Sequence, residues 1–250
     1  MYPENGRRKK VLLMKVGIVV CAAGKGTRVG GDIPKQFIKI GEKRVIDYTL
    51  DNILMSGVFD DVILVIRPGD RNEYEDYFGK VKFVDGDTED GQNSRRLGLK
   101  FAKNVLGYED DDIIGVADGN RPFMTPAFYL LLVNTAKTKG NAVPYMIQRD
   151  ILIRYDGEKA VLPGWSRNDY KVTLAPSFFP FKLVLDVYED AYDKGTLKDS
   201  EGVVSLIVER LEALDLNDRI NLVRGDSLCF KITTPDDVEM AKLIMKGLEN

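Results

Sequence analysis

The stretch VGIVVCAAGKGTRVGGDIPKQF, residues 16–37, joins an apolar run to a basic, glycine-rich loop. Residues 16–22 have the length and continuous apolar character of a central parallel strand that is covered on both faces. Residues 21–37 then contain four glycines, three cationic side chains and a single carboxylate, Asp32. Glycines let backbone N–H groups approach a ligand closely, so this loop is expected to bind an anion.

Strand and helix patterns alternate through the first half of the chain. Strands are predicted at 16–22, 62–66, 81–84 and 113–117, and helices at 44–56, 72–78, 94–103, 182–194, 201–213 and 235–248. This alternation predicts a single α/β domain over residues 1–250, Rossmann-like, with a mostly parallel sheet and helices on both faces. In such sheets ligands bind beyond the carboxyl ends of the strands, where the loop after residue 22 and the segment ADGNRP (residues 117–122) both lie.

Residues 144–166 have no helical period and predict a projecting β-arm. Asp156 and Gly157 form the expected hairpin turn, flanked by Ile151, Ile153 and Val161. A two-stranded ribbon is not stable alone in water. The arm is therefore expected to pack on a second copy of the chain in a homodimer.

The composition excludes several classes of protein. The formal net charge is -3, which argues against nucleic-acid binding, and histidine is absent, which excludes Ser-His-Asp catalysis.

The N-terminal segment is similar to a secretory signal, but Lys15 interrupts its apolar run, which argues against that interpretation. No run reaches the ~20 apolar residues of a membrane span. Two cysteines, Cys21 and Cys229, are expected to be reduced thiols of a cytoplasmic protein.

The loop does not match the common nucleotide-binding motifs. Val29 stands where a dinucleotide fingerprint needs its third glycine, and the Walker pattern also fails. The two cations Arg28 and Lys35 instead indicate that the loop stabilises the charge that develops on a reacting phosphorus atom. Such chemistry also needs Mg²⁺, and Asp118 is the best carboxylate to hold it. The alternatives are a solvated surface loop for the two cations and a capping or turn role for Asp118.

The loop sequence AAGKGTRVGGDIPKQF resembles the signature of the 2-C-methyl-D-erythritol 4-phosphate and ribitol-5-phosphate cytidylyltransferases. Its Gly-Thr-Arg and Pro-Lys parts are shared with sugar-nucleotide pyrophosphorylases, and Gln36 narrows the match to the cytidylyl branch. The resemblance implies a fold of the nucleotide-diphospho-sugar transferase type and two substrates, CTP and a polyol phosphate. It covers residues 16–244.

The resemblance also implies roles for individual residues. ADGNRP resembles H-D-A-A-R-P, which makes Asp118 the metal ligand and, with Arg121, part of the acceptor site; Arg167 and Lys231 would meet the acceptor phosphate. The catalytic cations would be Arg28, Lys35 and Lys231. The residues that would bind CTP are Ala22, Ala23, Gly24, Gly26, Thr27 and Ser94.

Several positions depart from the family pattern. Ala117 replaces a histidine, Gly91 an arginine, Ile151 a threonine, and Leu228 an acidic residue. The favoured hypothesis is transfer of CMP from CTP to a small polyol phosphate with release of pyrophosphate. The alternatives are a nucleotidyltransferase that uses another base or sugar phosphate, and a non-catalytic nucleotide-binding homologue.

Overall fold

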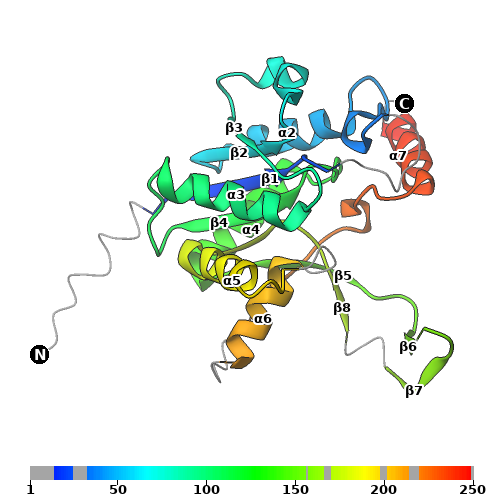
Figure 1. Ribbon diagram of the computed structural model, residues 1–250. Coiled ribbons are helices and arrows are strands. Elements are labelled where there is room, and N and C mark those ends of the chain that lie inside the picture. The colour runs from blue at the N-terminus through cyan, green and yellow to red at the C-terminus, as the bar shows by residue number, and fades with distance from the viewer. Residues whose placement is uncertain are drawn as a thin grey trace, which may run out of the picture.

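A five-stranded sheet with strand order β3-β2-β1-β4-β9 forms the centre of the computed structural model (Figure 1). The structure describes residues 14–24, 33–155, 157–165, 170–197, 202–213 and 220–248. The strands of the sheet are β1 (Val16–Cys21), β2 (Asp61–Ile66), β3 (Lys82–Asp85), β4 (Ile113–Asp118) and β9 (Ser177–Pro180). All neighbouring pairs are parallel except β4 and β9. The predicted α/β architecture with a mostly parallel sheet is confirmed.

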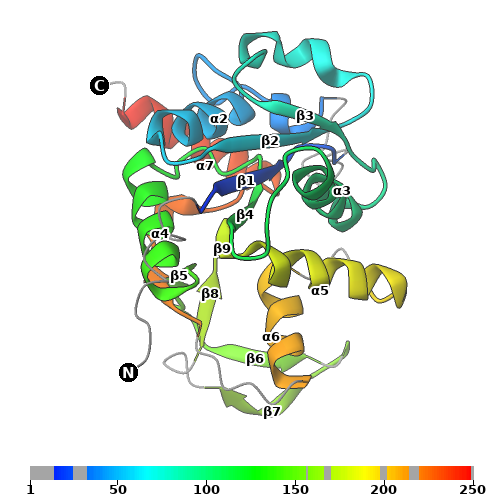
Figure 2. The same ribbon diagram turned by 90° about the vertical axis from the view of Figure 1, so that its left-hand side faces the viewer.

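Helices cover both faces of this sheet (Figure 2). One face carries α2 (Val45–Ser56) and α4 (Pro126–Lys139), and the other carries α3 (Gly91–Asn104) and α5 (Phe181–Asp193). The remaining helices are α6 (Val203–Ala213), α7 (Pro235–Leu248) and the short 3₁₀ segments η3 (Lys35–Phe37), η4 (Asp70–Tyr77) and η5 (Ser227–Cys229). No helix in this described part of the chain is both long enough and apolar enough to cross a lipid bilayer.

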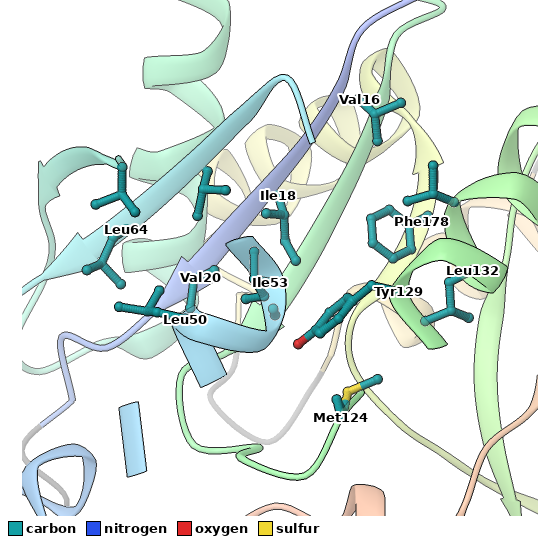
Figure 3. Packing of buried hydrophobic residues seen from close by; sticks show 14 of the residues in the cluster. Val16, Ile18, Val20, Leu50, Ile53, Leu64, Met124, Tyr129, Leu132 and Phe178 are labelled. Carbon is teal, nitrogen blue, oxygen red and sulfur yellow. The ribbon is translucent and has the colours of Figure 1, made fainter. Parts of the chain in front are cut away.

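The residues of β1 alternate between two hydrophobic cores. Val16, Ile18 and Val20 pack beneath α2 and α4 (Figure 3), whereas Val19 packs on the opposite face with α3 and α5. All four side chains are fully buried. Each contributes about 1.5–3 kcal/mol by leaving water. Burial on both faces explains why the sequence of β1 is one continuous apolar run.

Two smaller sheets extend from the central one. The three-stranded sheet has the order β10-β5-β8, and the two-stranded sheet pairs β6 with β7. Their strands are β5 (Val143–Ile147), β6 (Leu152–Tyr155), β7 (Ala160–Trp165), β8 (Lys171–Thr173) and β10 (Leu222–Arg224). The antiparallel pairing of β6 with β7 places a hairpin where the sequence predicted one. Its role as an arm between two subunits stays a prediction.

Some predicted helices differ in type or in their bounds. The helix expected at 72–78 is a 3₁₀ segment with a kink at Tyr74, in keeping with its low apolar content. The helix expected from residue 94 begins at Gly91, because the carboxylate of Asp90 accepts hydrogen bonds from the backbone N–H groups of Gln92 and Asn93. At α7 the predicted cap is present: Thr234 Oγ1 accepts from the Asp237 N–H at 3.3 Å.

Gly98 lets α3 approach the sheet closely, and this approach can be tested. A β-carbon there would lie 2.5 Å from Cγ1 of Val19 and 2.9 Å from Cγ2 of Val65. Gly98→Ala is therefore expected to lower the free energy of unfolding by about 1–3 kcal/mol, as measured by urea denaturation.

Gly247→Ala in α7 is the matched control. A β-carbon at Gly247 would meet no described atom within 4 Å. It should therefore stabilise the helix by at most about 1 kcal/mol. If Gly98→Ala proved equally harmless, the tight packing of α3 on β1 would be wrong.

Candidate active site

The candidate site lies at the carboxyl ends of β1 and β4, which pair side by side in parallel (Figure 1). Cys21, the last residue of β1, lies opposite Asp118, the last residue of β4. The N–H of Gly119 donates to the carbonyl of Cys21 at 2.9 Å, so the pairing continues past the strand ends. The glycine-rich loop and the ADGNRP segment therefore leave the sheet at the same edge, as predicted.

Asp118 is buried and pairs with three cations. Its Oδ1 accepts from Nη2 of Arg95 at 2.8 Å and from Nζ of Lys231 at 3.1 Å, and its Oδ2 accepts from Nε of Arg121 at 3.2 Å. Ion pairs with these three side chains connect α3, β4 and the segment after η5. The structure thus brings together Asp118, Arg121 and Lys231, which the sequence analysis had assigned to the acceptor site.

The charges around Asp118 determine its protonation state. Burial by itself would raise the pKa of its carboxyl, but the positive charges of Lys231, Arg95 and Arg121 lower that pKa well below its usual range. The neighbouring Cys21 behaves differently, since burial raises the pKa of its thiol to about 11. Asp118 is therefore an anion at neutral pH, and the Cys21 thiol stays protonated and is a poor nucleophile.

Backbone hydrogen bonds hold the cations in place. The N–H of Ile232 donates to the carbonyl of Asn120 at 3.0 Å, and the Asn120 side-chain amide donates to the carbonyl of Ile232. This reciprocal pair fixes the residue next to Lys231. Arg121 also donates from Nη1 to the carbonyl of Cys229 at 3.0 Å. The segment at 229–232 is thereby fastened to the end of β4.

A cavity of about 310 Å³ opens beside this cluster. Arg95, Asp118, Arg121 and Lys231 all line it. The rest of its wall comes from α3, β4, the stretch from the end of β8 to the start of β9, and the start of α6 with the residue before it; those residues are Gln92, Val116, Thr173, Leu174, Ala175, Ser177, Gly202, Val203, Val204 and Ser205. The cavity combines cations, hydroxyl groups and a helix N-terminus, and all three favour an anionic ligand.

The described residues predicted to bind CTP come from the end of β1, at residues 22–24, and from Ser94 of α3. The carboxamide of Gln36 donates to the carbonyl of Ala22 at 2.9 Å and to that of Gly24 at 3.4 Å, which anchors the start of the loop. A β-carbon at Gly86 would lie 2.7 Å from Cβ of Ala23 and 2.9 Å from Oγ of Ser94. Ala23 and Ser94 are therefore close neighbours, as expected for residues of one nucleotide site.

The predicted catalytic cations are only partly described. Lys35 begins η3, beside Gln36, and is half-buried. It is not among the described residues that contact Asp118 or line the cavity. Four other predicted site residues, Gly26, Thr27, Arg28 and Arg167, lie outside the described residues, so their assignments stay predictions.

The sequence analysis did not single out Arg95. It occupies the second turn of α3, four residues after Gly91, so the two positions share one face of the helix. Gly91 is the position where the family pattern has an arginine. The four-residue spacing between Gly91 and Arg95 could have identified Arg95 from the sequence. A long side chain in a helix leans back over the preceding turn, so that of Arg95 leans towards position 91.

The described residues could hold Mg²⁺ only through one carboxylate, together with substrate phosphates and water. Within the described ranges, no three aspartate, glutamate, cysteine or histidine side chains gather into a metal cage. Asp118 is the single carboxylate among the described residues that line the cavity. Mg²⁺ is commonly held by one or two carboxylates together with substrate phosphates and water. Asp118 fits that arrangement.

The fold and site together define a class of protein. The end of β1, where the glycine-rich sequence begins, and a buried cluster of cations with one carboxylate lie at the same edge of a mostly parallel sheet, as expected of a nucleotidyltransferase. The family model of 2-C-methyl-D-erythritol 4-phosphate cytidylyltransferase, IspD, matches residues 16–247. The chain belongs to this family, and the resemblance seen in the sequence is confirmed.

Individual relatives agree with this assignment. A 2-C-methyl-D-erythritol 4-phosphate cytidylyltransferase of Caldicellulosiruptor bescii is 30% identical over 93% of this chain and 98% of its own length. A ribitol-5-phosphate cytidylyltransferase of Lacticaseibacillus paracasei is 26% identical over 92% of this chain and 98% of its own length. A crystal structure of 4-diphosphocytidyl-2C-methyl-D-erythritol synthase from Anaerococcus prevotii superposes with a TM-score of 0.76 at 22% identity, covering 96% and 99% of the two chains, which supports the fold.

The lowered pKa of Asp118 predicts a specific dependence of stability on pH. An unfolded aspartate titrates near pH 3.9, so the stabilisation by the Asp118 anion is fully present above that pH and is lost as the pH falls towards the lower folded pKa. Asp118→Asn is expected to cost about 3–5 kcal/mol near pH 7. The difference from the wild type should shrink below about pH 4, as measured by urea denaturation.

Asp190→Asn is the control, because Asp190 pairs with Arg210 at 3.1 Å on the surface. Its cost should stay within about 1 kcal/mol. An Asp118→Asn cost that was the same at pH 3 and pH 7 would contradict the assigned ion cluster.

Proposed function

We propose that this chain transfers CMP from CTP to the phosphate of a small polyol phosphate and releases pyrophosphate. Family membership supports the reaction, and the observation that carries it in the structure is the cation cluster at Asp118 beside a cavity. The relatives named above act on methylerythritol phosphate or ribitol phosphate. Both compounds are therefore the acceptors to test.

The proposed chemistry is an in-line displacement at phosphorus. An oxygen of the acceptor phosphate forms a bond to the α-phosphorus of CTP, the bond from that phosphorus to the bridging oxygen breaks, and pyrophosphate leaves with the electron pair. Arg121 and Lys231 hold the acceptor phosphate, and Arg28 and Lys35 stabilise the charge that develops at the reacting phosphorus. Catalysis then rests on position and electrostatics.

Mg²⁺ is part of this proposal. Held by Asp118 and phosphate oxygens, it would neutralise charge on the triphosphate. Oδ1 of Asp118 is bonded to Arg95 and Lys231 in the structure. Both side chains also line the cavity, where they would meet phosphate oxygens of a bound acceptor.

The reaction is tested by measuring pyrophosphate release. The purified chain is mixed with Mg²⁺, one of CTP, UTP, GTP or ATP, and either 2-C-methyl-D-erythritol 4-phosphate or D-ribitol 5-phosphate. We expect release with CTP and one of the two acceptors. Nucleotide binding without pyrophosphate release in every combination would favour a non-catalytic homologue.

Lys35→Ala tests the proposed role of the loop in the same assay. It is expected to lower kcat by about 10²–10³-fold, since it removes charge stabilisation of the transition state, with a much smaller effect on the KM for CTP. Lys39→Ala is the control, because Lys39 is exposed and lies four residues further along the same segment. Full activity of Lys35→Ala would refute the mechanism.

We further propose that two copies of the chain associate through the β6/β7 hairpin. Ile151 and Ile153 are 70% and 58% exposed there, and Ile147 of β5 and Val172 of β8 are also exposed. Such a cluster of exposed apolar side chains is typical of an interaction surface. The cytoplasmic location predicted from the sequence belongs to this proposal too, because the proposed donor CTP is a nucleotide of the cell interior.

Ile151→Asp is expected to convert the dimer into a monomer, since it places a charge in the apolar contact. The mass is measured by light scattering coupled to size-exclusion chromatography. Leu243→Asp in α7 is the control, because Leu243 is equally exposed at 71% but lies away from the hairpin. A monomeric wild type would contradict the proposal.

A further inference from the structure

Arg95 and Ser94 are neighbours in α3 but face different parts of the site. Ser94 Oγ donates to the carbonyl of Asp87 at 2.8 Å and accepts from the N–H of Asp87 at 2.9 Å. It lies near Ala23, on the side where CTP is predicted to bind, which we call the nucleotide side. Arg95 lines the cavity and contacts Asp118. Successive helix residues are turned by about 100°, so one turn of α3 serves both sides.

The cluster around Asp118 carries more positive than negative charge. Arg95, Arg121 and Lys231 bring three cations to one carboxylate. The side chains of Arg95 and Arg121 are only 15% and 10% exposed. Buried cations without an equal number of anions are costly. The surplus of two positive charges therefore fits an anionic ligand in the adjoining cavity.

The three cations are not held equally. Arg121 has two anchors, Asp118 Oδ2 and the carbonyl of Cys229, which fix its guanidinium. Arg95 and Lys231 share the single atom Oδ1 of Asp118. A guanidinium has five N–H donors, and the bond from Arg95 to Asp118 uses one terminal nitrogen. Arg95 therefore keeps donors for a ligand in the cavity that it lines.

We propose that Arg95 binds the phosphate group of the acceptor and determines the affinity for it. This inference rests on the function proposed above and adds a residue that the family signature did not supply. A phosphate monoester carries a charge of about −1.5 to −2 at neutral pH. This charge would balance the two surplus positive charges of the cluster around Asp118. The planar guanidinium can bond two phosphate oxygens at once.

The first test is a comparison of KM and kcat. Arg95→Leu is expected to raise the KM of whichever acceptor the wild type turns over by about 10–100-fold, the loss expected for a hydrogen bond to a charged group. The kcat and the KM for CTP should change by less than about threefold, because this variant leaves the nucleotide side intact. Arg95→Lys should fall between wild type and Arg95→Leu.

Arg96→Leu is the matched control. Arg96 follows Arg95 in α3 and is similarly buried, but it pairs with Glu189 at 2.7 Å and its guanidinium lies 3.6 Å from the ring centre of Tyr192. This variant should lower the Tm and leave the KM of the acceptor unchanged. If Arg95→Leu leaves the acceptor KM within threefold of wild type, or lowers kcat alone, the proposal is overturned.

A second measurement does not depend on turnover. Inorganic phosphate should raise the Tm of the wild type and of Arg96→Leu in a concentration-dependent way, and this shift should be lost in Arg95→Leu. A wild type that turned over neither acceptor would refute the proposed function, and the phosphate titration would still decide the role of Arg95. An equal phosphate shift in wild type and Arg95→Leu, or no shift in the wild type, would overturn the role of Arg95.

Discussion

The ion cluster at Asp118 is the interaction on which the rest of the site depends. One buried carboxylate accepts hydrogen bonds from cations that belong to α3, to the turn after β4 and to the segment after η5. Neither the carboxylate nor the cations could be buried alone without a large desolvation penalty. Their mutual attraction holds three distant segments around one cavity.

The position of this cluster follows from the sheet. Because β1 and β4 are parallel and in register, Asp118 lies level with Cys21, where the glycine-rich loop begins. The two hydrophobic cores fix this register, since a slip by one residue would turn the side chains of β1 to the wrong face. Apolar packing therefore brings a polar site to the edge of the sheet.

Local signals explain which parts of the molecule could be predicted. The apolar run of β1, the cap of α7 and the glycine-rich loop each depend on residues close together in the chain, and the family signature lies within one such stretch. The type of η4 and the first residue of α3 were predicted wrongly. At α3 the error came from Asp90, whose carboxylate caps the helix earlier than the apolar pattern indicated.

The sequence by itself determined the α/β class and the family, and it predicted that Asp118, Arg121 and Lys231 belong to one site. Only the tertiary structure showed that Arg95 contacts Asp118. Its partner Asp118 lies 23 residues away, and Lys231 lies 113 residues from Asp118. Whether a buried arginine is an ordinary helix residue or part of a ligand site depends on the charges that folding places beside it. Local sequence patterns do not show which charges far apart in the chain come together on folding.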